Sequence, residues 1–136
     1  MPATERGCDA EAVALRCVIV DDNPEFLTAA RDVLSRERVE VVGVASSAAE
    51  AIRLVGDLRP DVALVDVYLG GDSGLDLARR LSAGSDGFRP AVIFISTYAE
   101  QDLAEVIAAS PAAGFLPKSD LSRAAIDRVL GRADQP

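Results

Sequence analysis

The chain has 136 residues, 49% hydrophobic but only 4% aromatic, which suits one domain with a core of aliphatic side chains. It contains no histidine, so histidine-based catalysis and metal ligation are excluded, and a formal net charge of -8 argues against binding a nucleic-acid backbone. No apolar run approaches the roughly 20 residues that span a bilayer. The charged first residues do not resemble a signal peptide, so we expect a cytoplasmic protein that contacts neither membrane nor nucleic acid.

Short apolar runs rich in β-branched residues recur along the chain and predict five β-strands. These runs span residues 16–20, 39–45, 61–66, 91–96 and 113–118. Pro117 weakens the last of them, because proline cannot donate to a strand ladder. Cys17 opens the first strand as a small core residue, whereas Cys8 lies in the polar leader, and neither cysteine has metal or redox spacing.

An amphipathic segment follows each strand and predicts a helix. These segments span residues 23–37, 47–58, 73–82, 100–109 and 121–131. One face of the first helix is predicted to carry Phe26, Leu27, Ala30, Val33 and Leu34. Gly131 is expected to end the last helix.

Several residues have the character of helix caps. Pro24 suits a first helical turn, and Ser47 followed by Glu50 three residues later predicts a capping box. Ser119 or Asp120 is expected to cap the last helix.

Strands that read as unbroken apolar runs are usually covered on both faces, which indicates a parallel sheet between two helix layers. We therefore predict an α/β fold with a doubly wound five-stranded parallel sheet, in the flavodoxin-like strand order 2-1-3-4-5. Residues 15–131 are expected to form this domain, and residues 1–14 and 132–136 are expected to be flexible tails.

Polar residues stand where these strands end. Asp21 and Asp22 follow the first strand, Asp66 ends the third, Ser96 ends the fourth, and Lys118 ends the fifth. Ligands bind at the carboxyl ends of the strands in such sheets, and the first and third strands are neighbours in this order. The three carboxylates are therefore predicted to meet, with a hydroxyl and an ammonium on the far side.

The chemistry of this cluster indicates phosphoryl transfer. Crowded carboxylates repel one another unless a cation offsets them, and an all-oxygen site suits Mg²⁺. A hydroxyl and a lysine nearby would hold a phosphoryl group, which makes Asp66 a candidate nucleophile. Taken singly, each residue has an ordinary alternative as a turn residue, a cap or a solvated side chain.

Four segments resemble the receiver domains of bacterial two-component response regulators. They are VIVDDNPEF (18–26), VALVDVYLGGDSGLDLA (62–78), VIFIST (92–97) and GFLPKSDL (114–121). The resemblance runs from about residue 16 to residue 130 and includes all of the strand-end residues above.

The resemblance implies roles for individual residues. Asp66 would be the phosphorylation site, and Asp22, Asp66 and the backbone carbonyl of Tyr68 would bind Mg²⁺, with Asp21 acting directly or through water. Ser96 would turn toward the phosphoryl group, and Lys118 would pair with it.

The resemblance further implies a conformational switch. Phe115 would change rotamer on activation, and Gly74 matches the glycine that follows the phosphorylation loop. The surface formed by the fourth helix, the fifth strand and the fifth helix would then change its shape.

The implied partners are a histidine kinase or phosphotransfer protein that supplies the phosphoryl group, and a downstream protein or output domain. The chain would catalyse its own phosphorylation and slow dephosphorylation without being an enzyme for a free substrate. Three alternatives stay open: a receiver cut from a longer transcription factor, a phosphorylation-independent pseudo-receiver, and an aspartyl-phosphate hydrolase of another α/β family.

The sequence departs from the family pattern at three positions. Gly70 stands where proline is usual, which favours a more mobile loop. Ser119 follows Lys118 where many members have proline, often in a cis peptide, and Pro117 precedes the lysine instead. Phe115 replaces the commoner tyrosine, so a switch must rest on packing alone.

Two further hypotheses concern surfaces. Tyr68 and Tyr98 follow Asp66 and Ser96 by two residues each, and could stand at the pocket rim and screen an acyl phosphate from water. Their alternative is two exposed loop tyrosines. The last helix offers small and apolar residues for a homodimer, although the same residues could pack on the sheet: Ala124, Ala125, Val129 and Leu130.

Overall fold

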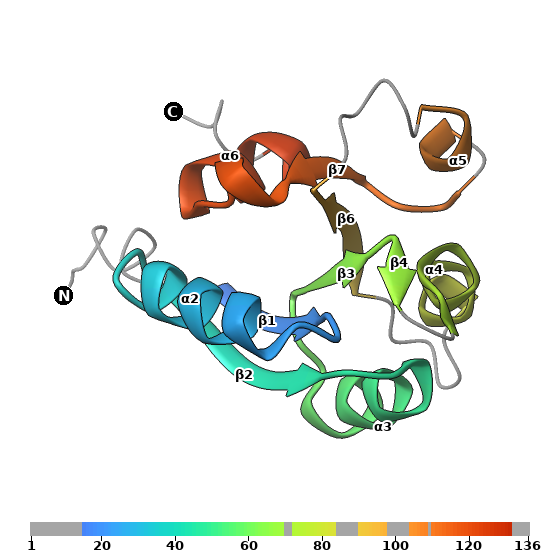
Figure 1. Ribbon diagram of the computed structural model, residues 1–136, viewed down its shortest axis with the longest axis horizontal. Coiled ribbons are helices and arrows are strands. Elements are labelled where there is room, and N and C mark those ends of the chain that lie inside the picture. The colour runs from blue at the N-terminus through green and yellow to red at the C-terminus, as the bar shows by residue number, and fades with distance from the viewer. Residues whose placement is uncertain (1–14, 70–71, 84–89, 98–103, 109, 132–136) are drawn as a thin grey trace, which may run out of the picture.

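The computed structural model describes residues 15–69, 72–83, 90–97, 104–108 and 110–131 (Figure 1). The segments predicted as tails, 1–14 and 132–136, and the loop residues Gly70 and Tyr98 lie outside this description. The boundaries of the domain, and the expected mobility of the loop at Gly70, therefore stay predictions.

Five parallel strands form one sheet in the order β2-β1-β3-β6-β7. They are β1 (Leu15–Val20), β2 (Val39–Ala45), β3 (Val62–Asp66), β6 (Ala91–Ser96) and β7 (Gly114–Pro117). The predicted order 2-1-3-4-5 is confirmed, because β4 and β5 belong to a separate small hairpin. Strands β1 and β3 are direct neighbours, so Asp21 and Asp66 leave the sheet side by side.

Helices cover both faces of the sheet (Figure 1). They are α2 (Pro24–Ser35), α3 (Ala48–Leu58), α4 (Gly74–Ala83), α5 (Ala104–Ala108) and α6 (Arg123–Leu130). The buried residues of α2 and α6 belong to one apolar cluster, and those of α3 and α4 to another. Among the described residues, no helix has the length and apolar character needed to cross a membrane.

The core follows from the alternation of side chains along each strand. In β1, Val18 and Val20 pack into the cluster under α3 and α4, whereas Cys17 and Ile19 pack into the cluster under α2 and α6. All four are fully buried, and burial raises the pKa of the Cys17 thiol, which is therefore a core residue as expected. Val33, predicted to face the core, is 38% exposed, because α2 presses only its inner stripe, with Ala30 and Leu34, against the sheet.

Helix caps fix where α2 and α3 begin. The side chain of Asn23 accepts hydrogen bonds from the first turn of α2, and Pro24 is the first residue of that helix. Ser47 caps α3 as predicted, but Glu50 reaches back to the backbone N–H of Ser46. The capping box is thus closed one residue earlier than in its usual form.

The cap predicted for the last helix is wrong. Lys118 to Asp120 form a 3₁₀ turn after β7, so Ser119 and Asp120 lie before the helix begins. Ser122 is the cap, and its hydroxyl accepts a hydrogen bond of 3.0 Å from the N–H of Ala125. Gly131 ends the helix in a left-handed conformation, as predicted.

A two-stranded antiparallel hairpin follows β3 and was not predicted. It consists of β4 (Tyr68–Leu69) and β5 (Asp72–Ser73). The side chain of Leu69 in β4 is buried in the core, and the Ser73 hydroxyl accepts from the N–H of Asp76 in the first turn of α4. The hairpin therefore carries the chain directly from the end of β3 into α4.

Candidate functional site

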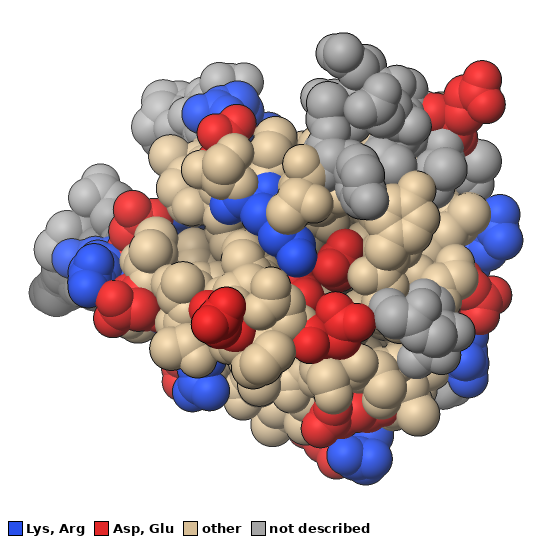
Figure 2. Space-filling view, in the orientation of Figure 1, with Lys and Arg blue, Asp and Glu red and all other residues tan. Residues whose placement is uncertain are grey.

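The strand ends bring three predicted carboxylates together on one side of the molecule. Asp21, Asp22 and Asp66 each offer an oxygen, and these oxygens lie within 4.8 Å of one another. Asp21 and Asp66 are buried, whereas Asp22 is exposed. Figure 2 shows acidic side chains beside a basic one near the middle of the face that it displays.

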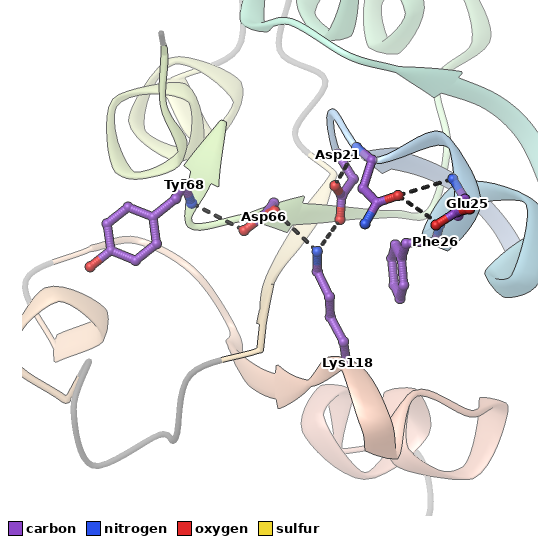
Figure 3. A network of polar contacts seen from close by, with 7 residues as sticks. Asp21, Glu25, Phe26, Asp66, Tyr68 and Lys118 are labelled. Carbon is purple, nitrogen blue, oxygen red and sulfur yellow. Dashed lines mark hydrogen bonds and ion pairs between the residues drawn. The ribbon is translucent and has the colours of Figure 1, made fainter. Parts of the chain in front are cut away.

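Backbone contacts hold the two buried carboxylates in place. The N–H of Asp21 donates to the carbonyl of Ala45 on β2, and its Oδ1 accepts from the N–H of Asn23 at 2.9 Å. Asp66 is the last residue of β3, and its Oδ1 accepts from the N–H of Tyr68 at 3.1 Å. Each carboxylate thus uses one oxygen for the loop that follows its strand and directs the other toward the site (Figure 3).

Lys118 supplies the cation that lies between these carboxylates (Figure 3). Its Nζ lies 2.5 Å from Oδ2 of Asp21 and donates a hydrogen bond of 3.2 Å to Oδ2 of Asp66. The contact with Asp21 is an ion pair without the alignment of a hydrogen bond. The ring of Phe26 lies on another side of the ammonium, with its centroid 4.5 Å from Nζ.

The electrostatics of the site follow from burial. Burial raises the pKa of Asp66 and outweighs the lowering effects of the Tyr68 N–H and of Lys118. For Lys118, burial acts to lower the pKa, but the contacts with Asp21 and Asp66 prevail and raise it. The ammonium therefore stays charged and lies against two buried carboxyl groups, with the carboxyl of Asp22 nearby.

The predicted switch residues are both buried. Ser96 is the last residue of β6, is 1% exposed, and lies beside Pro117 in the parallel register of β6 and β7. Phe115 is 7% exposed and lies beside Phe94 in the same register. The aromatic side chain is therefore inside the core in this state of the molecule.

Of the two tyrosines predicted at the pocket rim, the structure describes Tyr68 but not Tyr98. Tyr68 is 55% exposed, and Figure 3 shows its ring directed away from the carboxylate of Asp66. Tyr98 lies outside the described residues, so its position stays a prediction.

The structure explains why residue 74 is a glycine, which the sequence did not reveal. A Cβ atom at this position would lie 2.2 Å from the carbonyl oxygen of Asp66 and 2.8 Å from that of Val67. The N–H of Gly74 also donates to the carbonyl of Val67. Only glycine allows α4 to begin this close to the end of β3.

A further feature concerns the turn that carries Lys118. The described residues contain no cis peptide bond, so the segment from Pro117 to Ser119 reaches the site through trans peptides and a 3₁₀ turn.

The contact between Phe26 and Lys118 was missed from the sequence. The available signal was that Phe26 lies in the first helical turn after the acidic pair, at the same edge of the sheet as the site.

The donor set fits a hard divalent cation. Three carboxylates, one exposed and two buried, offer oxygen ligands only, which are the ligands that Mg²⁺ prefers. One oxygen of the fully buried Asp21, its Oδ2, makes no aligned hydrogen bond in the described part of the chain. Its neighbour there is the ammonium of Lys118, so this oxygen already lies where a positive charge is favourable.

Comparisons with known proteins agree with this geometry. The DNA-binding transcriptional activator DevR/DosR of Mycobacterium tuberculosis is 32% identical over 124 residues, covering 88% of this chain and 56% of that protein. Protein-glutamate methylesterase/protein-glutamine glutaminase 5 of Myxococcus xanthus is 36% identical over 88 residues, covering 64% of this chain and 25% of that protein. The chain thus spans between a quarter and about half of the length of these curated relatives.

Solved structures and a family model complete the comparison. The signal receiver domain of a NarL response regulator from Mycobacterium tuberculosis has a TM-score of 0.74 and 32% identity, covering 88% of this chain and 99% of that domain. The model of the response regulator receiver domain matches residues 17–129. The chain therefore belongs to the receiver domain family of response regulators.

Proposed function

We propose that this receiver is a switch controlled by phosphorylation of Asp66 in a Mg²⁺-dependent reaction. The observation that carries the proposal is the meeting of Asp21, Asp22 and Asp66 with Lys118 at one edge of the sheet. An ordinary set of turn residues would not bury two carboxylates against the same ammonium.

The chemistry is an in-line transfer to a carboxylate. An oxygen of ionised Asp66 attacks the phosphorus of a phosphohistidine, the P–N bond breaks, and the imidazole leaves with its electron pair and takes up a proton. The product is an acyl phosphate on Asp66. Lys118, already within hydrogen-bond distance of Asp66, is placed to move from the carboxylate to a phosphoryl oxygen.

The residues that would hold Mg²⁺ are Asp21, Asp22 and Asp66. The family resemblance adds the backbone carbonyl of Tyr68. When bound, the ion would neutralise the charge of the phosphoryl oxygens during transfer. This role agrees with a site in which three carboxyl groups lie near one ammonium.

The switch would begin at Ser96. Its hydroxyl, at the same sheet edge as Asp66, would turn toward the phosphoryl group, and Phe115 would repack into the space that this opens. Such a change would alter the surface of α5, β7 and α6. A shift from mostly inactive to mostly active requires about 5.5 kcal/mol of differential stabilisation.

The partners follow from the chemistry of the donor. The sequence has no histidine, so the phosphoryl group would come from a histidine kinase or a phosphotransfer protein in the cytoplasm. A downstream protein or an output domain would read the switched surface. Ala125, Val129 and Leu130 pack in or against the apolar core, so a homodimer through α6 would have to use its outer face, where Ala124 is exposed. We propose residues 15–131 as the functional domain.

We retain the hypothesis that Tyr68 and Tyr98 lengthen the lifetime of the acyl phosphate. Because the Tyr68 ring is directed away from Asp66, screening would require it to rotate toward the site after phosphorylation. Faster dephosphorylation of Tyr68→Ala and Tyr98→Ala would support this role, and unchanged rates in both would contradict it.

The proposed function is tested by phosphotransfer from histidine kinases and from acetyl phosphate. The wild-type protein should be labelled in Mg²⁺, and chelation of Mg²⁺ or the substitution Asp66→Asn should abolish labelling. Binding of a partner by the folded protein without any labelling would favour a phosphorylation-independent pseudo-receiver. Steady release of phosphate from a small ester would favour a hydrolase.

A further inference from the structure

An aromatic ring lies against the charged end of Lys118. The centroid of the Phe26 ring is 4.5 Å from Nζ, inside the distance of about 6 Å over which the face of a ring attracts a cation. In Figure 3 the ammonium lies between Asp66 and this ring. The side chain of Lys118 is only 12% exposed, so the ring takes a place that water would otherwise hold.

The ring is fixed by the same residue that fixes Asp21. The N–H of Phe26 donates to Oδ1 of Asn23 at 3.2 Å, and the N–H of Asn23 donates to Oδ1 of Asp21 at 2.9 Å. Asp21 and Phe26 both contact the ammonium of Lys118. The segment from Asp21 to Phe26 therefore presents a carboxylate and a ring to Lys118, and hydrogen bonds through Asn23 link the two residues.

The chemistry of a ring differs from that of a third carboxylate at this position. A carboxylate would bind the ammonium tightly and add another negative charge to the site. An aliphatic side chain would exclude water without compensating the charge. The face of a ring stabilises the ammonium without holding it by a directed hydrogen bond, so the ammonium can exchange its other partners.

We infer that Phe26 is a positioning residue for Lys118. Its ring keeps the ammonium beside Asp66 while the ammonium exchanges the carboxylate for an oxygen of the incoming phosphoryl group. The contact itself does not depend on phosphorylation. Its consequence for the rate rests on the function proposed above, so the two are tested by separate measurements.

The contact is measured by NMR on protein labelled at lysine. Lys118 is the only lysine of the sequence, so the label gives one side-chain signal. The ring current of Phe26 should move the protons on Cε of Lys118 upfield of those in an unfolded control. Phe26→Leu should remove this shift and Phe26→Tyr should keep it, whereas a wild-type signal at the unfolded position would overturn the inference.

The consequence is measured as the rate of Asp66 labelling by acetyl phosphate at saturating Mg²⁺. Phe26→Leu, which keeps an apolar side chain but loses the ring, should react about 3- to 10-fold more slowly than the wild type. Phe26→Tyr, which keeps a ring, should react at close to the wild-type rate. Leu27→Ala is the matched control, because it removes volume from the same half-buried turn of α2 but no ring. It should react at close to the wild-type rate.

The outcomes separate the inference from the proposed function. A wild-type rate in Phe26→Leu would overturn the positioning role, and so would equal slowing of Phe26→Leu, Phe26→Tyr and Leu27→Ala, which would indicate packing alone. A wild-type protein that takes no label would instead contradict the proposed function, and the NMR shift would still report whether Phe26 holds Lys118.

Discussion

The ammonium of Lys118 lies 2.5 Å from Oδ2 of Asp21, so the residue that follows the last strand of the sheet contacts the residue that follows the first. The same ammonium reaches Asp66 at 3.2 Å. One cation therefore holds together three strand ends, those of β1, β3 and β7, and the stability of the site depends on its charge.

Removal of this charge should destabilise the protein in a pH-dependent way. Lys118→Met leaves two buried carboxylates without their counter-ion, which we expect to lower the free energy of unfolding by about 1–3 kcal/mol near neutral pH without Mg²⁺. The loss should shrink in acid, where the carboxyl of Asp66, whose pKa burial raises, becomes protonated. Urea unfolding at both pH values measures this, with Lys118→Arg as a control that keeps the charge. An equal loss at both pH values would contradict the ion-pair explanation.

Asp66→Asn should stabilise the protein when Mg²⁺ is absent. Because burial raises the pKa of Asp66 in the folded state, the fold favours the protonated carboxyl. The stability that this contributes is present at low pH and is lost as the pH rises through the raised pKa of the folded state. Asn cannot ionise, so the variant should exceed the wild type in stability at neutral pH, and the difference should narrow in acid.

Urea unfolding of the wild type and of Asp66→Asn, from acid to neutral pH, measures which of the two is more stable at each pH. The control is Asp57→Asn, which removes an exposed acid on α3, away from the site. Asp57→Asn should show no comparable gain at neutral pH. A wild type more stable than Asp66→Asn at neutral pH would mean that the ionised carboxylate is favourable in the fold.

Mg²⁺ should stabilise the folded protein through the same carboxylates. At a concentration 100-fold above its dissociation constant, a ligand that binds only the folded state adds about 2.7 kcal/mol. Asp22 is exposed, so Asp22→Asn should leave the metal-free stability nearly unchanged but weaken the stabilisation by Mg²⁺. Thermal unfolding during Mg²⁺ titration measures this, and an unchanged response of Asp22→Asn would exclude that residue as a ligand.

Gly74→Ala should disturb the end of β3. The added Cβ would lie 2.2 Å from the carbonyl oxygen of Asp66, which is backbone and cannot move aside freely. We expect a loss of about 1–3 kcal/mol in unfolding free energy and slower phosphorylation of Asp66. Gly56→Ala is a matched control, because a Cβ there meets nothing within 4 Å and the residue lies inside α3.

Gly56→Ala should therefore gain about 0.5–1 kcal/mol from the better helix propensity of alanine. Both variants are compared by urea unfolding. If Gly74→Ala were as stable as Gly56→Ala, the close approach of α4 to Asp66 would not be needed for the fold.

The parallel sheet could be predicted because each of its strands is an apolar run that alternates with an amphipathic helix. The strand order is the one that the flavodoxin-like fold gives to such a sheet. Val18 and Ile19 point to opposite faces of the sheet and both are fully buried, so these runs show no polar alternation and indicate a sheet covered on both sides. The carboxylates could be placed together for the same reason, since the strand order fixes which strand ends are neighbours.

Other features depend on tertiary contacts that no local pattern contains. Strands β4 and β5 have two residues each, too few for a period to show. The cap of α6 moved to Ser122 because the 3₁₀ turn at Lys118 uses the residues that resembled a cap. The contact between Phe26 and Lys118 joins α2 to the end of β7, and only the packed fold brings these together.

The most direct test of the proposed switch is to identify which residue carries the phosphoryl group. Protein incubated with acetyl phosphate and Mg²⁺ is treated with borohydride, which reduces an acyl phosphate of aspartate to homoserine, and is then mapped by mass spectrometry. We predict homoserine at position 66 and nowhere else. Homoserine at another aspartate, or a stable phosphate on a serine such as Ser96, would contradict the assignment of Asp66 as the phosphoacceptor.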